Sequence, residues 1–364
     1  MTRIVHLCVG LMTILAVAAC AASGPGRALV APAPTVEVSP ALETEVVAST
    51  NVDAADDPAI WSASPGDAVM LNGPTAGFIA GTDKKAGLYI FGLDGRTRQF
   101  LPEGLLNNVD LRGGIGIAGR PQVVIGASDR GRFGVALYLF DPGSADPSNA
   151  VRFWGMIKSD VTEPYGFCMG RLGTELHAIL IGKDGQVRQY RIEDGGQGPV
   201  GTEVRRFAVG SQSEGCVVDD EGGALYIGEE LKGLWRYGLR PSEGAGRDLI
   251  QAVDSSGRLV ADVEGATLIR DRTGTYLIVS SQGDSAFALW RVSAGAPAYV
   301  GRFRVVAANG IDAVTGTDGI DAISGAVGTF PSGFLVIQDD ENEGMTQNFK
   351  IVDWRTVQSA LKLR

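Results

Sequence analysis

Short apolar runs alternate with polar clusters along most of the chain, and residues 262–292 show the pattern clearly. Two acids precede a first apolar run, a second run at residues 276–279 ends in Ser-Ser-Gln-Gly, and a third covers residues 287–292. Runs of this length between Gly, Asp and Ser clusters predict antiparallel strands. The start of one strand and the end of its antiparallel neighbour lie at the same sheet edge. We therefore expect the polar clusters at one edge.

The same unit recurs six times. Its opening motif begins at Asp57, Asn108, Tyr165, Glu214, Glu264 and Asp318. Its strand-end motif covers residues 82–84, 128–130, 182–184, 228–230, 281–283 and 338–340. The spacing of about 50 residues is typical of propeller blades, which stack around a central channel. The sequence predicts an all-β, six-bladed β-propeller whose polar motifs meet at one mouth of that channel.

The two ends of the repeat region predict how the ring closes. The sixth unit lacks room for an outer strand, whereas the β-prone residues 36–47 precede the first unit. We expect residues 36–47 to form the outermost strand of the last blade, because pairing first with last removes exposed sheet edges. Asp353 is a candidate N-cap, and the helical apolar spacing of residues 354–363 predicts a short C-terminal helix.

The first 35 residues stand apart from the repeats. Arg3 and the apolar stretch after it predict a signal peptide over residues 1–20. The sequence Val-Ala-Ala-Cys ending at Cys20 resembles the lipobox of bacterial lipoproteins, which implies a lipid anchor at Cys20; an ordinary cleaved signal peptide is the alternative. Residues 21–35 predict a flexible tether and residues 36–364 the propeller domain. We expect export to the periplasm or outer membrane as an anchored protein, or secretion.

The composition of the chain limits the classes of binding partner. The chain has 364 residues, of which 45% are hydrophobic, enough for a large core, and a net charge of −10. That charge argues against a sequence-independent nucleic-acid partner, and we expect a monomer. Cys168 and Cys216 occupy equivalent positions of adjacent units. A disulfide and two packed thiols both fit, so their pairing stays open.

Oxygen donors dominate the expected channel mouth. They are the carboxylates of Asp57, Asp110, Glu214, Glu229, Asp262, Glu264, Asp318 and Asp339, and the amide of Gln282. Two like charges about 4 Å apart repel by about 4 kcal/mol at an effective dielectric constant of about 20. A bound cation removes this cost, and Ca²⁺ best matches a large set of flexible oxygen ligands. Any single carboxylate has the alternative role of a turn former.

Cations occupy the strand-end motif in only half of the units. Lys84, Arg130 and Lys183 hold it in units one to three, whereas units four to six carry Glu229, Gln282 and Asp339 there. A polyanion fits this division, because Arg and Lys bind phosphate while calcium neutralises the acidic half. The alternative is that the three cations only pair with neighbouring acids. His177 is the only histidine after the predicted signal peptide, which argues against histidine-based covalent catalysis.

These motifs resemble those of the β-propeller phytases, and the resemblance covers nearly the whole sequence from Glu43 to the C-terminus. The matching segments are residues 53–61, 84–88, 106–110, 165–167, 182–185, 213–215, 262–265, 280–283, 317–321, 338–342 and 347–350. The resemblance implies a calcium-dependent phosphomonoesterase of the 3-phytase type. Such an enzyme hydrolyses phytate (myo-inositol hexakisphosphate) to lower inositol phosphates and orthophosphate by direct attack of a metal-activated water.

The resemblance also implies roles for individual residues. Ligands of the catalytic calcium ions would be Glu214, Glu229, Asp262, Glu264, Gln282 and Asp318. Further calcium ligands would be Glu43, Asp57, Asp312, Asp339, Glu341 and Asn342. Substrate contacts would come from Lys84, Arg130, Tyr165, Lys183 and Asp184, and the catalytic set would be Lys84, Arg130, Lys183, Glu214 and Glu229.

Three positions depart from the family pattern: Asp83 stands for an Asn, Asp184 for a Glu and Asp340 for a Gly. We expect these changes to loosen one peripheral calcium site without removing activity. Two other functions stay open for a propeller of this kind, a calcium-dependent lactonase and a non-enzymatic surface protein that binds ligands. A lactonase would not need three cations opposite the acids.

Overall fold

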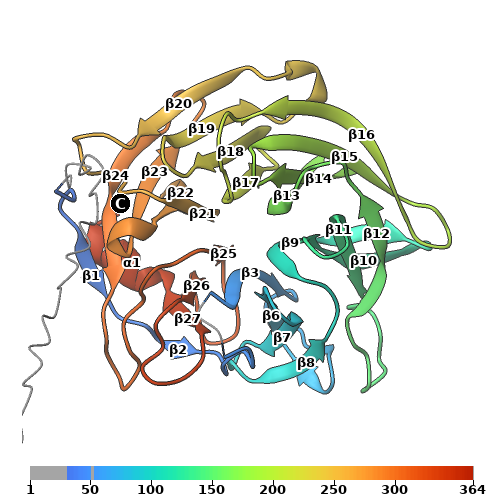
Figure 1. The fold of residues 1–364 in the computed structure, drawn as a ribbon. Helices are drawn as coiled ribbons and strands as arrows, with labels where there is room; N and C mark the ends of the chain where they lie inside the picture. Colours follow the sequence, from blue (N-terminus) through green and yellow to red (C-terminus); the bar gives the residue numbers. More distant parts are fainter. Residues whose placement is uncertain (1–30, 51–52, 364) are drawn as a thin grey trace, which may run out of the picture.

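A computed structural model describes residues 31–50 and 53–363. Within these residues, six sheets of four or five strands surround a central axis, and a separate two-stranded ribbon joins β4 (Val69–Met70) to β5 (Pro74–Thr75). Figure 1 looks along the axis and shows the sheets arranged as blades. The predicted all-β, six-bladed propeller is confirmed.

Each blade has four antiparallel strands, ordered from an inner to an outer strand. Blade one contains β3 (Ala55–Ser62), β6 (Gly77–Asp83), β7 (Gly87–Gly92) and β8 (Thr97–Leu101). Blade two contains β9 (Leu106–Ile117), β10 (Arg120–Asp129), β11 (Gly134–Phe140) and β12 (Arg152–Lys158). Blade three contains β13 (Pro164–Leu172), β14 (Glu175–Gly182), β15 (Gln186–Asp194) and β16 (Pro199–Ala208).

The second half of the ring repeats this plan. Blade four contains β17 (Cys216–Asp219), β18 (Ala224–Glu229), β19 (Gly233–Gly238) and β20 (Arg247–Ala252). Blade five contains β21 (Val263–Asp271), β22 (Gly274–Ser281), β23 (Ala286–Val292) and β24 (Ala298–Val305). Blade six contains β25 (Ile320–Ser324), β26 (Gly333–Asp339) and β27 (Asn348–Asp353). Short 3₁₀ turns, η1 (Pro241–Glu243) and η2 (Gln282–Asp284), lie in blades four and five.

The middle strands are buried between neighbouring blades. β6 and β11 are buried at every residue because both faces of each sheet are covered. Glycines allow the closest approaches: a Cβ at Gly81 would lie 2.6 Å from the Phe349 ring of blade six, and one at Gly126 would lie 2.6 Å from the Phe167 ring of blade three. Blade-to-blade packing of apolar side chains therefore holds the ring together.

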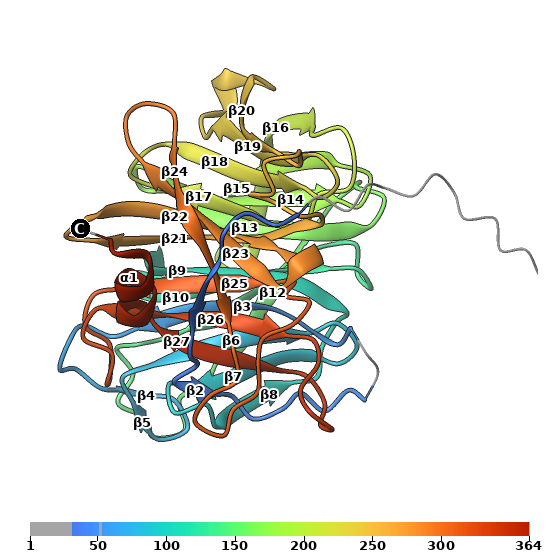
Figure 2. The same ribbon diagram turned by 90° about the vertical axis from the view of Figure 1, so that its left-hand side faces the viewer.

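The N-terminal segment closes the ring, but it contributes to two blades. Leu42–Glu43 (β2) pairs with β27 and completes blade six, as the sequence predicts. Val36–Val38 (β1) instead runs parallel to β24 as a fifth strand of blade five, so the prediction of one continuous strand over residues 36–47 is wrong. Pro40 lies between the two strands and has no N–H for a sheet ladder, which favours a break there. Figures 1 and 2 show β1 beside β24.

The predicted C-terminal helix is present as α1 (Trp354–Leu361). The Asp353 side chain caps it by accepting a hydrogen bond from the Arg355 N–H at 2.9 Å. Trp354 and Val357 are its buried residues. No helix among the described residues has the length and apolar character needed to cross a membrane. The predicted signal peptide and Cys20 lie outside the described residues.

A disulfide joins Cys168 to Cys216, with the two Cα atoms 5.7 Å apart. Cys168 belongs to β13 and Cys216 to β17, the inner strands of blades three and four. The structure thus selects the bridge over two packed thiols. The bridge ties two adjacent inner strands close to Tyr165 and Glu214, which lie three and two residues before the cysteines.

Candidate active site

Three glutamates form a compact cluster at one mouth of the channel. Each of Glu214, Glu230 and Glu264 offers an oxygen, and these oxygens all lie within 4.8 Å of one another. Glu214 lies just before β17, Glu230 follows β18, and Glu264 is in β21. Strand starts and a strand end therefore meet at one edge, as the repeat pattern predicts. All three side chains are buried.

Hydrogen bonds satisfy the cluster only in part: Glu214 accepts one from Asn107 Nδ2, but two other oxygens of the cluster accept none from any described residue. Glu230 Oε1 and Glu264 Oε2 are buried and have no hydrogen-bond partner among the described residues. Burial raises the pKa of Glu214 and Glu264, and neighbouring carboxylates raise it further. Burial also raises the pKa of Glu230 to about 7. Close, unpaired carboxylate oxygens are the donors that a hard divalent cation such as Ca²⁺ prefers, so the residues fit such an ion.

The structure places Glu230, and not Glu229, beside Glu214 and Glu264. Glu229 accepts hydrogen bonds from Ser211 Oγ at 2.6 Å and from Trp235 Nε1 at 2.8 Å. Successive side chains of a strand point to opposite faces, so neighbours in sequence separate. The sequence analysis chose Glu229 from the Gly-Glu-Glu run at residues 228–230. In the structure β18 ends at Glu229, and the acid that joins the cluster is the next residue, Glu230.

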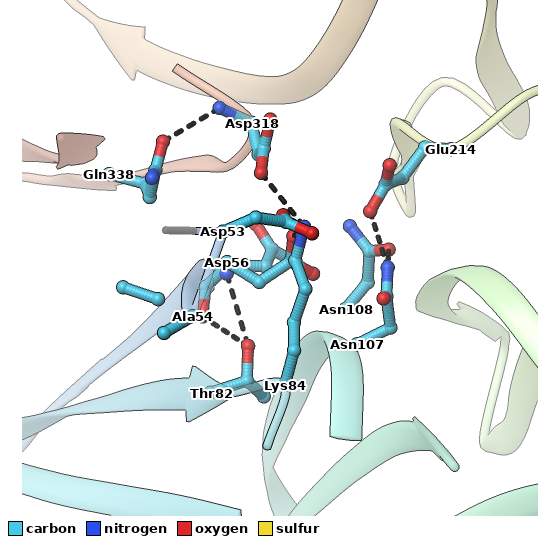
Figure 3. Close-up of polar contacts among 12 residues, drawn as sticks. Asp53, Ala54, Asp56, Thr82, Lys84, Asn107, Asn108, Glu214, Asp318 and Gln338 are labelled. Atoms are coloured by element: carbon cyan, nitrogen blue, oxygen red, sulfur yellow. Dashed lines mark hydrogen bonds and ion pairs between the residues drawn. The ribbon is translucent and has the colours of Figure 1, made fainter. Parts of the chain in front are cut away.

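Lys84 lies across the channel mouth from Glu214, at the centre of a second group of acids. Its Nζ atom forms ion pairs with Asp53, with Asp56 at 2.8 Å and with Asp318 at 2.9 Å. Burial alone would lower the pKa of Lys84, but Asp56 and Asp318 raise it well above its usual value. Figure 3 shows Lys84 reaching toward these three acids, with Glu214 across from them. Lys84 is therefore charged and joins blades one and six.

Asp56 is a site residue that the sequence analysis missed. It is fully buried, and neither of its oxygens has a hydrogen-bond partner within the described part of the chain apart from the Lys84 ion pair. Asp57, which the sequence analysis chose, lines the channel, and its Oδ2 accepts the Val109 N–H at 3.0 Å. Strand alternation again separates the two neighbours. The Asp-Asp doublet at the start of the first unit was the available signal.

Asp262, Gln282 and Asp318 complete the acidic rim. Gln282 Nε2 donates to Asp318 Oδ1, and the Gln282 N–H donates to the Asp262 carbonyl at 3.0 Å. Burial raises the pKa of Asp318 to about 7 against the opposing effect of Lys84. Asp262 comes two residues before Glu264 in the chain, and its negative charge contributes to the raised pKa of Glu230 and Glu264.

The remaining cations follow the rim through blades two and three. Arg130 Nη2 donates to the Lys84 carbonyl at 3.2 Å. Lys183 is exposed, and its Nζ lies 5.3 Å from the centre of the Tyr165 ring. Burial and then Glu214 raise the pKa of Tyr165, so its hydroxyl stays protonated. Asp184 is exposed and accepts the Gln186 N–H at 3.1 Å, which shapes the turn that carries Lys183.

The channel continues beneath this rim as a cavity of about 220 Å³. All six inner strands line it, and its polar residues include Asp57, Asp110 and Asp321. Arg112 neutralises part of that charge through ion pairs with Asp110 at 2.8 Å and Asp220 at 3.0 Å. Asp110 thus lies in the channel wall and not at the glutamate cluster.

Four of the six further calcium ligands that the sequence analysis predicts form a separate group, away from the channel mouth. Glu43, Asp312, Asp339 and Asn342 surround the ammonium group of Lys350. Glu341 is exposed and does not contact that ammonium group. The sequence analysis placed Asp339 at the channel mouth, whereas its partner in the structure is Lys350 and not Lys84.

Comparison with known proteins identifies relatives of the whole propeller. The model of the phytase family matches residues 2–363. The 3-phytase of Bacillus subtilis (strain 168) is 35% identical over 332 residues, which cover 88% of this chain and 84% of that protein.

Among solved structures, two propellers share the fold at low sequence identity. Regucalcin from Agrobacterium tumefaciens, a calcium-binding protein, is 16% identical and superposes with a TM-score of 0.54 over 88% of this chain and 97% of its own. A luciferin-regenerating enzyme is 11% identical and has a TM-score of 0.51 over 85% of this chain and 94% of its own. At these identities the likeness concerns the fold alone.

Proposed function

This chain belongs to the phytase family and hydrolyses phytate, and we propose that it does so at the channel mouth between the glutamate cluster and Lys84, with calcium bound. One observation carries the proposal: buried, unpaired carboxylate oxygens of Glu230 and Glu264 lie at the same mouth as a row of cations. Acids alone would repel a polyphosphate, and cations alone would not explain why so many acids are buried together.

Seven residues are the proposed calcium ligands, and they share oxygen donors at the acidic rim: Asp56, Glu214, Glu230, Asp262, Glu264, Gln282 and Asp318. When bound there, calcium supplies positive charge that offsets the carboxylates, attracts phosphate oxygens and lowers the pKa of a water molecule. The unpaired oxygens described above support this assignment.

The cationic residues would bind and orient the phosphate to be cleaved. Arg130 offers a planar pair of donors and Lys84 a buried point charge, and both suit phosphate oxygens. Lys183 extends the cationic rim toward Tyr165. As water attacks phosphorus and the bond to the inositol oxygen breaks, these groups would stabilise the negative charge on the other phosphate oxygens. The products are orthophosphate and a lower inositol phosphate.

For the cellular setting, we propose export with a lipid anchor at Cys20 and action as a monomer. The lipobox-like sequence before Cys20 supports the anchor. The Cys168–Cys216 disulfide supports an oxidising compartment, since such bridges persist outside the cytosol.

The test measures phosphate release from phytate by the purified enzyme. Hydrolysis of a lactone and binding of phytate are measured in parallel. We expect phosphate release and no lactone opening. Lactone hydrolysis without phosphate release, or phytate binding without turnover, would contradict the proposal. A variant with Lys84→Met serves as the inactive control, because Lys84 is proposed to contact the phosphate.

A further inference from the structure

The ammonium group of Lys350 lies at the centre of the predicted peripheral calcium site. Lys350 is fully buried. Its Nζ atom lies 2.7 Å from Glu43 Oε2, 2.5 Å from Asp312 Oδ1, 3.1 Å from Asn342 Oδ1 and 3.2 Å from Asp339 Oδ2. Four oxygens that the sequence analysis assigned to a calcium ion therefore surround a cation of the chain itself.

This cation is positioned at the seam where the ring closes. Glu43 belongs to β2, the N-terminal strand, and pairs directly with Lys350 in β27. Asp339 ends β26, and Asp312 lies between β24 and β25. The Lys350 ammonium group in β27 thus contacts the N-terminal strand β2. It also contacts the end of β26 and the segment between β24 and β25.

Each of the four oxygens has a partner without a metal ion, although Asp339 Oδ2 has only the ion pair with Lys350, because it is buried and accepts no hydrogen bond from the described residues. An ammonium group has three N–H donors, and Glu43, Asp312 and Asn342 lie within hydrogen-bonding distance of it. Burial alone would lower the pKa of Lys350, but Asp312 and Glu43 raise it, so the group is charged.

Each carboxylate also accepts a hydrogen bond from an N–H group. Asn348 Nδ2 donates to Glu43 at 3.0 Å, the Glu343 N–H donates to Asp312 at 3.1 Å, and the Thr315 N–H donates to Asp339 at 2.9 Å. At the channel mouth, by contrast, Glu230 Oε1 and Glu264 Oε2 have neither a hydrogen-bond partner nor an ion-pair partner among the described residues, whereas Asp339 Oδ2 has its ion pair with Lys350. The acids at the channel mouth therefore still need a cation, whereas the acids around Lys350 already have one.

We propose that Lys350 is a built-in cation that takes the place of a calcium ion at this seam, so that Glu43, Asp312, Asp339 and Asn342 bind no metal in the native protein. Three acids against one ammonium leave excess negative charge, but Glu43 has 30% of its side chain exposed, and solvent screens that charge. The proposal concerns stability and calcium stoichiometry and does not depend on the hydrolytic reaction.

The test counts bound calcium by isothermal titration calorimetry and follows thermal unfolding with calcium or chelator. Asp312→Asn, with Lys350 intact, is expected to bind as many calcium ions as the wild type and to show the same calcium-dependent shift in melting temperature. Lys350→Met is expected to melt at a lower temperature in chelator and to gain one calcium ion per chain. The double variant Lys350→Met/Asp312→Asn is expected to lose that gained ion.

Loss of a calcium ion in Asp312→Asn, or no gain in Lys350→Met, would overturn the proposal. If Lys350→Met does not fold, Asp312→Asn alone decides the question. Glu230→Gln is the matched control, because it alters the channel mouth and leaves the seam intact. An unchanged calcium count in Glu230→Gln would contradict the proposed function and not the role of Lys350, so the two failures are distinguishable.

Discussion

Lys84 Nζ lies 2.9 Å from Asp318 Oδ2, although 234 residues separate them in the chain. Lys84 follows β6 of blade one and Asp318 precedes β25 of blade six. The contact therefore exists only when the ring is closed. At this point of the rim, the candidate active site is assembled by the closure of the propeller ring.

Lys84→Met is expected to reduce kcat for phytate by about 10²-fold or more, because it removes a buried charge from the phosphate site. It also leaves Asp56 and Asp318 without their cation, and breaking a buried pair costs about 3–5 kcal/mol. Steady-state kinetics and chemical denaturation measure the two effects. A folded variant with wild-type kcat would remove Lys84 from the site.

Glu230→Gln and Glu229→Gln form a matched pair of adjacent substitutions. We expect Glu230→Gln to lower kcat by about 10²-fold, because Glu230 belongs to the proposed calcium-binding cluster. Glu229→Gln is expected to change kcat by less than about tenfold, since Glu229 is held by Ser211 and Trp235 and not by the cluster. The opposite order of effects would show that the strand end is wrongly placed.

The chelated protein is expected to lose stability as the pH rises from about 4.5 to about 7. Burial raises the pKa of Glu230 to about 7 from 4.5, so between these values the folded state keeps a proton that the unfolded state has lost. Stability is greatest below the unfolded pKa and falls toward the folded one. Denaturant titrations at several pH values measure this slope, and Glu230→Gln should reduce it. A slope of opposite sign would contradict the assignment.

Reduction of the Cys168–Cys216 bridge, or replacement of both cysteines by serine, is expected to lower the free energy of unfolding by about 2–4 kcal/mol. The bridge closes a loop across a sequence separation of 48 residues, which restricts the unfolded chain. Denaturant unfolding with and without reductant measures the difference. Equal midpoints under both conditions would show that the bridge contributes nothing to stability.

The propeller could be predicted because its signal repeats. Polar clusters at a spacing of about 50 residues predict both the blades and the edge where they meet. Ring closure was only partly predictable: Leu42–Glu43 joins blade six as expected, but Val36–Val38 pairs with blade five. Both segments are β-prone, and the choice of sheet depends on tertiary contacts that the pattern does not contain.

The site was predictable to the nearest pair of residues. Asp56 and Asp57 are adjacent acids, as are Glu229 and Glu230. The sequence analysis chose Asp57 and Glu229, whereas the structure places Asp56 beside Lys84 and Glu230 beside Glu214 and Glu264. A single residue of uncertainty in a strand exchanges the two faces. The sequence analysis included Lys350 in a matching segment but did not place it among the predicted calcium ligands, because its neighbour in the fold, Glu43, lies 307 residues away.

The central claim is that bound calcium makes the crowded acids at the channel mouth compatible with a polyphosphate. Phosphate release from phytate before chelation, after chelation and after calcium is restored tests it most directly. We predict turnover that chelation abolishes and calcium restores, with the fold intact throughout by circular dichroism. Undiminished phosphate release from the calcium-free enzyme would contradict the claim.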